Sequence, residues 1–250
     1  FAFGSTTGTP PFCQDFTVSC STAFVGLSDQ LRDDDLSTAA KALGIGAGWN
    51  EEESDAYGIE LGTLTERFDR FEEGCQVLIG LLSQETTDFD GRFYQLKAAR
   101  NEPKGPQRPH PPICIGGNGE KRTLRITAKY ADHWNFVGGT PAEFARKRDV
   151  LKAHCADVGR NPKEIMLSAH IRLTPDRGPR GVIEDAIALG AEGLDLAIVY
   201  LPLPYDVGIL EPLAETIRDS GLWRPATAWG RIETAPGSSS SAKGRSGRIV

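Results

Sequence analysis

The chain has 250 residues, 39% of them hydrophobic and 25% charged, a composition typical of a globular protein of one large or two small domains. Its net charge of −6 argues against a nucleic-acid partner, because nucleic-acid binding requires a basic surface. The five cysteines form no C-x-x-C pair and have no histidine at metal-ligand spacing, so we expect a reduced, cytoplasmic protein without a metal site. We expect no membrane partner, because there is neither a bilayer-spanning apolar run nor a signal-peptide pattern, although the first residue is Phe1 rather than Met.

The first 42 residues form an atypical N-terminal segment. They are rich in Thr, Ser, Gly and Asp, and their apolar residues follow neither the strand period nor the helix period. The regular pattern begins at Leu43, where LGIGAGW alternates apolar residues with glycines up to Trp49. A strand over Leu43–Trp49 would have one face of glycines, which predicts close approach by a ligand or by another backbone.

A helix, a hairpin and a loop follow. Thr63 and Glu66 have the spacing of a capping box, and an apolar stripe through Phe71 and Cys75 predicts the helix behind it. The Asp90-Gly91 turn predicts a small hairpin. Five prolines in residues 101–112 predict an extended loop.

The most informative pattern is the turn Gly116-Gly117-Asn118-Gly119, which follows the apolar run Ile113–Ile115 and precedes a basic amphipathic segment. A helix that opens from a glycine turn presents unpaired backbone N–H groups and the positive end of its dipole, which favours a phosphate. Lys121 and Arg122 either add charge there or form a solvent-exposed helix face. The alternative is that these glycines only make the bend.

Strands and helices then alternate to the end of the ordered pattern. Thr140, Pro141 and Glu143 give a helix start of high specificity. The expected elements are helices near 120–130, 140–158, 181–189 and 209–218 and strands at Asp132–Val137, Met166–Leu173 and Leu194–Leu201. The tail 223–250, which becomes Ser/Gly-rich after Ala235, is predicted to be disordered.

This alternation predicts an α/β fold with a parallel sheet. Five strand-helix units resemble the later part of a (β/α)8 TIM barrel. A Rossmann-type sheet is the alternative, but the glycine turn lacks G-x-G-x-x-G spacing. Three further units need roughly 90 residues, so we expect an incomplete barrel over residues 43–222 that lacks most of its first three units.

His170 is the catalytic candidate that the pattern itself supports. In the predicted strand Met166–Leu173, Ser168, His170 and Arg172 alternate with apolar residues. Outward faces of barrel strands pack on helices, so this polar set should face the interior or the mouth. The alternative is a structural histidine in a hydrogen-bonded network.

Several segments, taken in chain order, resemble the luciferase-like monooxygenase superfamily. Their sequences are most similar to the branch that uses coenzyme F420. The matching segments are LGIGAGWNEEE, ERFDRFEEGCQVLIGLL, FDGRFYQL, RPHPPICIGGNGEKRTLRITAKYADHWN and LPLPYD. The resemblance implies a flavin- or deazaflavin-dependent oxidoreductase that transfers a hydride between reduced coenzyme F420, or alternatively FMN, and a small organic substrate.

The resemblance also implies cofactor-binding residues. Gly116, Gly117, Asn118 and Gly119 would hold the phosphate, Gly46, Gly48 and Trp49 would lie near the ring system or the substrate, and Trp134 and Asn135 would lie at the next strand's mouth. His133, which stands where family members usually have glycine, is the second catalytic candidate. An incomplete barrel leaves sheet edges uncovered, which favours a homo-oligomer.

Two other functions remain open. The chain could be a non-catalytic fragment of such an enzyme, because residues 1–42 do not match the family's first strands. It could also be a generic phosphate-binding β/α-barrel enzyme, although no catalytic Lys or Glu stands out beyond Glu51 to Glu53.

Overall fold

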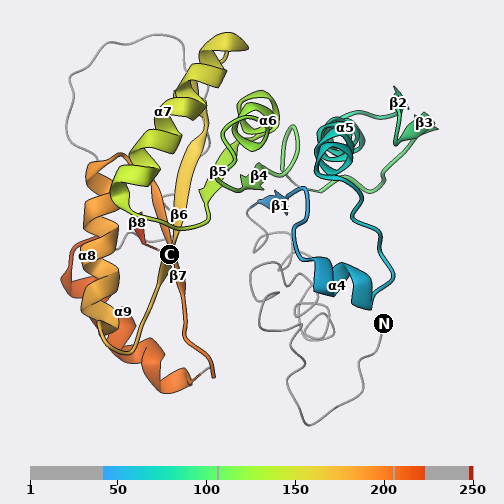
Figure 1. The fold of residues 1–250 in the computed structure, drawn as a ribbon. Coiled ribbons are helices and arrows are strands. Elements are labelled where there is room, and N and C mark those ends of the chain that lie inside the picture. Colours follow the sequence, from blue (N-terminus) through green and yellow to red (C-terminus); the bar gives the residue numbers. More distant parts are fainter. Residues whose placement is uncertain (1–41, 106, 205, 223–247, 250) are drawn as a thin grey trace. The chain divides into compact units, whose positions relative to one another are not determined.

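The computed structural model describes residues 42–105, 107–204, 206–222 and 248–249, and these form two compact units (Figure 1). The first unit ends at Ile115 and the second begins at Gly116. The predicted bounds of the barrel portion, 43–222, stay a prediction. The predictions for residues 1–41 and for nearly all of the tail lie outside the described residues.

The first unit joins two short parallel strands to two helices and a hairpin. Strand β1 (Leu43–Ile45) pairs with β4 (Ile113–Gly116), and Leu43 lies opposite Ile113. Between them come α4 (Glu51–Ala56), α5 (Leu64–Ser83), β2 (Thr87–Asp90) and β3 (Gln95–Ala99). β1 is shorter than the predicted Leu43–Trp49, because Gly48 turns the chain with a φ of +80° and the glycines have no side chains to pack.

Helix α5 starts at the predicted capping box. The Thr63 hydroxyl accepts from the Glu66 N–H at 3.2 Å, and the Glu66 carboxylate accepts from the Thr63 N–H at 3.1 Å. Phe71 and Cys75 from the predicted stripe are buried. The hairpin β2–β3 is also confirmed.

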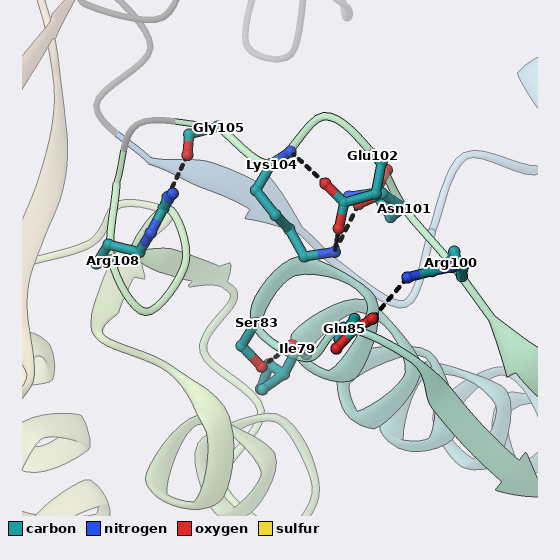
Figure 2. Close-up of polar contacts among 9 residues, drawn as sticks. All are labelled: Ile79, Ser83, Glu85, Arg100, Asn101, Glu102, Lys104, Gly105 and Arg108. Atoms are coloured by element: carbon teal, nitrogen blue, oxygen red, sulfur yellow. Dashed lines mark hydrogen bonds and ion pairs between the residues drawn. The ribbon is translucent and has the colours of Figure 1, made fainter.

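Local polar contacts hold the end of α5 and the predicted extended loop that follows the hairpin (Figure 2). Glu85, just after α5, pairs with Arg100 at 2.6 Å. Lys104 Nζ donates to the Asn101 carbonyl at 2.5 Å and pairs with Glu102 at 3.2 Å. Each contact in this loop spans only a few residues, so the loop holds its shape without regular backbone pairing.

The hairpin turn is fastened to α5 by Glu73. The Glu73 carboxylate accepts from the N–H groups of Arg92, Phe93 and Tyr94 at 2.9, 2.8 and 3.2 Å. Burial raises the pKa of this carboxyl, but the three backbone hydrogen bonds and the charge of Arg92 outweigh that effect and hold the pKa below its usual range.

Replacing Glu73 with alanine should therefore release the hairpin from α5. We expect a loss of about 1–2 kcal/mol in the free energy of unfolding, because three donors lose a charged acceptor. Hydrogen exchange should accelerate in residues 87–99. Glu85→Ala, which removes one exposed ion pair, is the matched control and should change stability by less than about 1 kcal/mol. Equal exchange in both variants would contradict this role.

The second unit alternates helices with parallel strands in the order β5-β6-β7-β8. Its elements are α6 (Thr123–Tyr130), β5 (His133–Phe136), α7 (Pro141–Asp157), η2 (Pro162–Glu164), β6 (Met166–Arg172), α8 (Gly178–Ala191), β7 (Leu196–Tyr200), η3 (Val207–Ile209), α9 (Leu210–Asp219) and β8 (Arg248–Ile249). From the tail predicted to be disordered, the structure describes only β8, which pairs with β7.

The core of this unit lies between the strands and the helices α7, α8 and α9, which follow one face of β5–β7 in Figure 1. Trp134 and Phe136 on β5 pack against Phe144 on α7, with ring centroids 5.7 and 5.5 Å from it. Ala169 and Ile171 on β6 are also buried there. One face of each strand is therefore apolar and covered by helices, as expected for a barrel strand.

The predicted α/β class with parallel strands is confirmed, and five β/α units recur in the described residues, as in the later part of a β/α barrel. The capping box of Thr140 and Glu143 is present. Two helix starts differ from prediction. Helix α8 begins at Gly178, because Pro179 suits its first turn, and α6 begins only at Thr123, after a three-residue turn.

Candidate functional site

The glycine loop after β4 is fastened to β5. The Gly117 N–H donates to the Asn135 carbonyl at 3.1 Å, and the Trp134 indole N–H donates to the Gly117 carbonyl at 2.9 Å. Gly117 has a φ of +123°, which favours glycine. Both hydrogen bonds cross from the loop to the neighbouring strand, so they fix the loop at the end of the sheet.

Asn118 joins this loop to a second glycine turn, Gly138-Gly139. Its Nδ2 donates to the Gly138 carbonyl at 3.2 Å, and its Oδ1 accepts from the Val137 N–H at 3.1 Å. Gly138 and Gly139 have φ values of +119° and +137°. Asn118, predicted as a direct cofactor contact, therefore serves at least to connect the two turns.

The loop has the features that a phosphate requires. Among the described residues, no backbone carbonyl accepts from the N–H groups of Asn118 and Gly119. A Cβ on Gly119 would lie 2.7 Å from Thr123 Oγ1, so the Thr123 side chain already packs against Gly119, whereas Gly116 faces open space. Free N–H groups in a glycine turn form an anion-binding concavity, so the loop fits the phosphate group of a cofactor.

The charges beside the loop are largely paired. Glu120 contacts Arg146, and it pairs with Lys147 at 2.8 Å. The hydrogen bond from Lys147 and the charges of both cations lower the pKa of Glu120, so this carboxylate is ionised and neutralised by its partners. Lys121 is exposed on the surface. The backbone of the loop therefore provides most of its attraction for an anion.

A polar face lies on β5 and β6, opposite the helix-covered face. Ser168 is at its centre, fully buried, with its Oγ 2.6 Å from His133 Nε2 and 2.7 Å from Asn135 Nδ2. Asn135 lies opposite Ser168 in the parallel register. This face confirms the predicted alternation of polar and apolar residues along β6.

His133 lies at the amino end of β5, opposite Met166. It is 5% exposed, and its Nδ1 has no hydrogen-bond partner among the described residues. Burial lowers the pKa of His133 to about 4, helped by the charge of His170. The glycine turns follow the carboxyl end of β5, and His133 is three residues, or about 10 Å, from that end at 3.3 Å per residue. This distance favours a supporting role for His133, and its catalytic role stays a prediction.

His170 lies nearer the carboxyl end of β6, and it contacts Tyr200 on β7. The Tyr200 hydroxyl is 3.1 Å from His170 Nε2, and the two ring centroids are 4.3 Å apart. Burial lowers the pKa of His170 to about 4, and the charge of Arg172 acts in the same direction. His170 is therefore neutral at pH 7, so it can accept a proton from a reacting group.

Trp134, predicted to lie at the strand mouth, packs in the core of the second unit. Its side chain is fully buried, and its ring stacks on Phe144 with an interplanar angle of 7°. Successive strand residues point to opposite faces, so Trp134 and Asn135 could not both face a ligand. Trp134 acts on the site only through its bond to Gly117.

The remaining predicted cofactor residues lie in the first unit. Gly46 lines a cavity there, the Gly48 carbonyl accepts from Arg67 Nη1 at 3.4 Å, and Trp49 is 75% exposed. In the second unit, hydrogen bonds join Trp134 and Asn135 to Gly117 of the glycine loop. In the first unit, only Gly46 of the three predicted residues lines the cavity.

Sequence reasoning missed the site roles of Ser168, Tyr200, Gly138 and Gly139. A signal for three of them was present. A glycine pair follows β5 directly before a capping box, and Tyr200 lies opposite Arg172 at the carboxyl end of the next strand. The central place of Ser168 had no sequence signal beyond its polarity.

No helix in the described part of the chain is both long enough and apolar enough to cross a membrane.

Three known proteins illustrate what this chain is similar to. The chain is 30% identical over 148 residues to the FMNH(2)-dependent dimethylsulfone monooxygenase of Pseudomonas putida, covering 59% of this chain and 40% of that protein. It is 31% identical over 175 residues to the pyrimidine monooxygenase RutA of Stutzerimonas stutzeri, covering 64% and 48%. The coenzyme F420 dependent tetrahydromethanopterin reductase from Methanopyrus kandleri superposes with a TM-score of 0.49 and 16% identity, covering 60% and 46%.

This chain spans 40 to 59% of the length of the first curated relatives that it matches. The sequence model of the family described as "luciferase-like monooxygenase" matches residues 40–200, which is more than half of the chain. The chain therefore belongs to the luciferase-like monooxygenase family.

Proposed function

We propose that this chain binds coenzyme F420 or FMN and acts as an oxidoreductase on a small organic substrate. The observation that carries the proposal is the glycine loop held against β5. Within the described residues no backbone carbonyl accepts from the N–H groups of Asn118 and Gly119, and the neighbouring Gly116 faces open space. Family membership supports the same reading.

Each group at the site has a role in this proposal. When bound, the reduced cofactor supplies a hydride to the substrate. Asn118 and Gly119 hold the phosphate through their backbone N–H groups, beside the open space at Gly116. The Asn118 side chain keeps the loop against the turn at Gly138. Neutral His170 relays a proton between its Nε2 and the substrate through the Tyr200 hydroxyl, which lies 3.1 Å from Nε2.

The choice between the two cofactors needs an experiment. The matching segments are most similar in sequence to the F420-dependent branch, whereas a relative from Pseudomonas putida is named as FMNH(2)-dependent. Both cofactors carry a phosphate, so the glycine loop suits either one.

The competing proposal is a non-catalytic fragment. It draws support from residues 1–39, which lie outside the segment that the family model matches. Cofactor binding without turnover would favour the fragment, and binding with turnover would favour the enzyme. Family membership, in turn, argues against an unrelated phosphate-binding barrel.

Titration of the purified chain with FMN and with coenzyme F420, followed by cofactor fluorescence, tests the proposal. We expect saturable binding of one of them. Gly116→Asp should weaken it about tenfold or more, because a carboxylate then faces the phosphate. Gly116 suits this test better than Gly117, since a Cβ on Gly116 meets nothing within 4 Å and one on Gly117 lies 3.1 Å from Thr123.

The control is Gly105→Asp, in a loop of the first unit where an added Cβ also has room. It should leave the affinity unchanged. If neither cofactor binds saturably to the unmodified chain, the proposal fails. If Gly116→Asp binds as tightly as the control, the phosphate lies elsewhere.

A further inference from the structure

The first unit contains a cavity that the proposed function does not use. Its volume is about 250 Å³, room for about eight water molecules. It is open on one side and is lined by the segment after β1, the segment before α5, one face of α5 and Tyr94 before β3. The lining residues that matter here are Leu61, Arg67, Arg70, Phe71, Leu78 and Tyr94.

Local contacts position Leu61 and Tyr94, which line two sides of this cavity. The segment that carries Leu61 runs between Gly58 and Gly62, which have φ values of +64° and +70°, and Leu61 Cδ2 lies 3.2 Å from where a Cβ on Gly48 would be. On the opposite side, the Glu73 carboxylate holds the Tyr94 N–H at 3.2 Å. The cavity is therefore built by contacts that fix both of its sides.

Two arginines from one face of α5 line the cavity, and their donors are only partly used. Arg67 makes one long hydrogen bond, to the Gly48 carbonyl at 3.4 Å, and its Nε has no partner among the described residues. Arg70 lies over the Phe93 ring, 5.2 Å from its centroid. Glu60 is the only acidic residue of the lining, against two arginines, so the lining has a net charge of +1.

We propose that this cavity binds a small carboxylate with a flat apolar body, the class to which benzoate belongs. A guanidinium is planar and matches a carboxylate through two parallel hydrogen bonds, which would supply the acceptor that Arg67 lacks. Phe71, Leu78 and Tyr94 would contact the apolar body. The inference stands apart from the proposed function, because every residue it uses lies in the first unit and no cofactor takes part.

Isothermal titration of the full chain with benzoate tests the proposal, with benzamide as the neutral molecule of the same shape. We expect saturable benzoate binding and binding of benzamide about tenfold weaker or more. Inorganic phosphate should not compete, because it offers no apolar body.

Two substitutions locate the site. Gly74→Leu should abolish binding by filling the cavity, since a Cβ on Gly74 points toward the Tyr94 ring at 3.8 Å and the helical position accepts any side chain. Arg67→Gln should weaken binding about tenfold to a hundredfold. Arg100→Gln, which lies outside the cavity, is the matched control and should bind like the unmodified chain.

Three results would overturn the proposal: no saturable benzoate binding, equal binding of benzamide, or full binding by Gly74→Leu. Because Arg67 also supports Gly48, Arg70→Gln provides the second charge test if Arg67→Gln loses its helical circular dichroism signal. Full benzoate affinity in Arg70→Gln would then overturn the role of the arginines.

Discussion

Replacing Trp134 with alanine is expected to lower the free energy of unfolding by about 3–5 kcal/mol, as measured by urea denaturation. The indole is fully buried, and it contacts both Phe136 and Phe144, so its removal leaves a cavity at the junction of β5 and α7. The substitution also removes the hydrogen bond that holds the Gly117 carbonyl.

Two further variants separate these effects. Ile187→Ala, at a position that is 54% exposed, is the control and should change stability by less than about 0.5 kcal/mol. Trp134→Phe keeps an aromatic ring against Phe144 but removes the indole N–H. It should cost less stability than Trp134→Ala and still weaken cofactor binding, because the loop loses its fastening. Cofactor affinity equal to that of the unmodified chain would show that Trp134 matters only for packing.

The free energy of unfolding is expected to fall as the pH drops from about 7 to about 4, and the titration of His133 is expected to account for much of this fall. The pKa of His133 is about 4 in the folded chain, against 6.5 for an ordinary histidine, so the unfolded state binds more protons between these values. The stabilising effect is therefore complete above pH 6.5 and decreases through the window toward pH 4. For His133 it amounts to about 3 kcal/mol. The lowered pKa of His170 acts in the same direction.

Urea denaturation at several pH values measures this effect. Replacing His133 with glutamine should flatten the profile between pH 7 and pH 4, because the titrating group is gone. His110→Gln is the matched control, since His110 lies in the proline-rich loop and contacts the Pro111 carbonyl. A slope in His133→Gln as steep as in the unmodified chain would refute the assignment.

The local elements were largely predictable from the sequence. Capping boxes at Thr63 and Thr140 fixed two helix starts, because both partners of each box lie within three residues. The polar and apolar alternation of β6 predicted which face its helices would cover. Errors arose at glycines and prolines, where β1 ended early and α8 began early.

The candidate site was predictable only in part. Its glycine loop was evident because turn chemistry is local. Trp134, predicted beside Asn135 at one strand mouth, packs against Phe144, and strand parity alone would have separated the two side chains.

By itself, then, the sequence determined the periodicity, the caps and the glycine turns of this protein, since these depend on residues a few positions apart. Only the tertiary structure decided that Ser168 lies between His133 and Asn135, that Asn118 joins two glycine turns, and that Tyr200 contacts His170. The physical reason is that these contacts join residues 20 to 35 positions apart, and the register between parallel strands sets their distances.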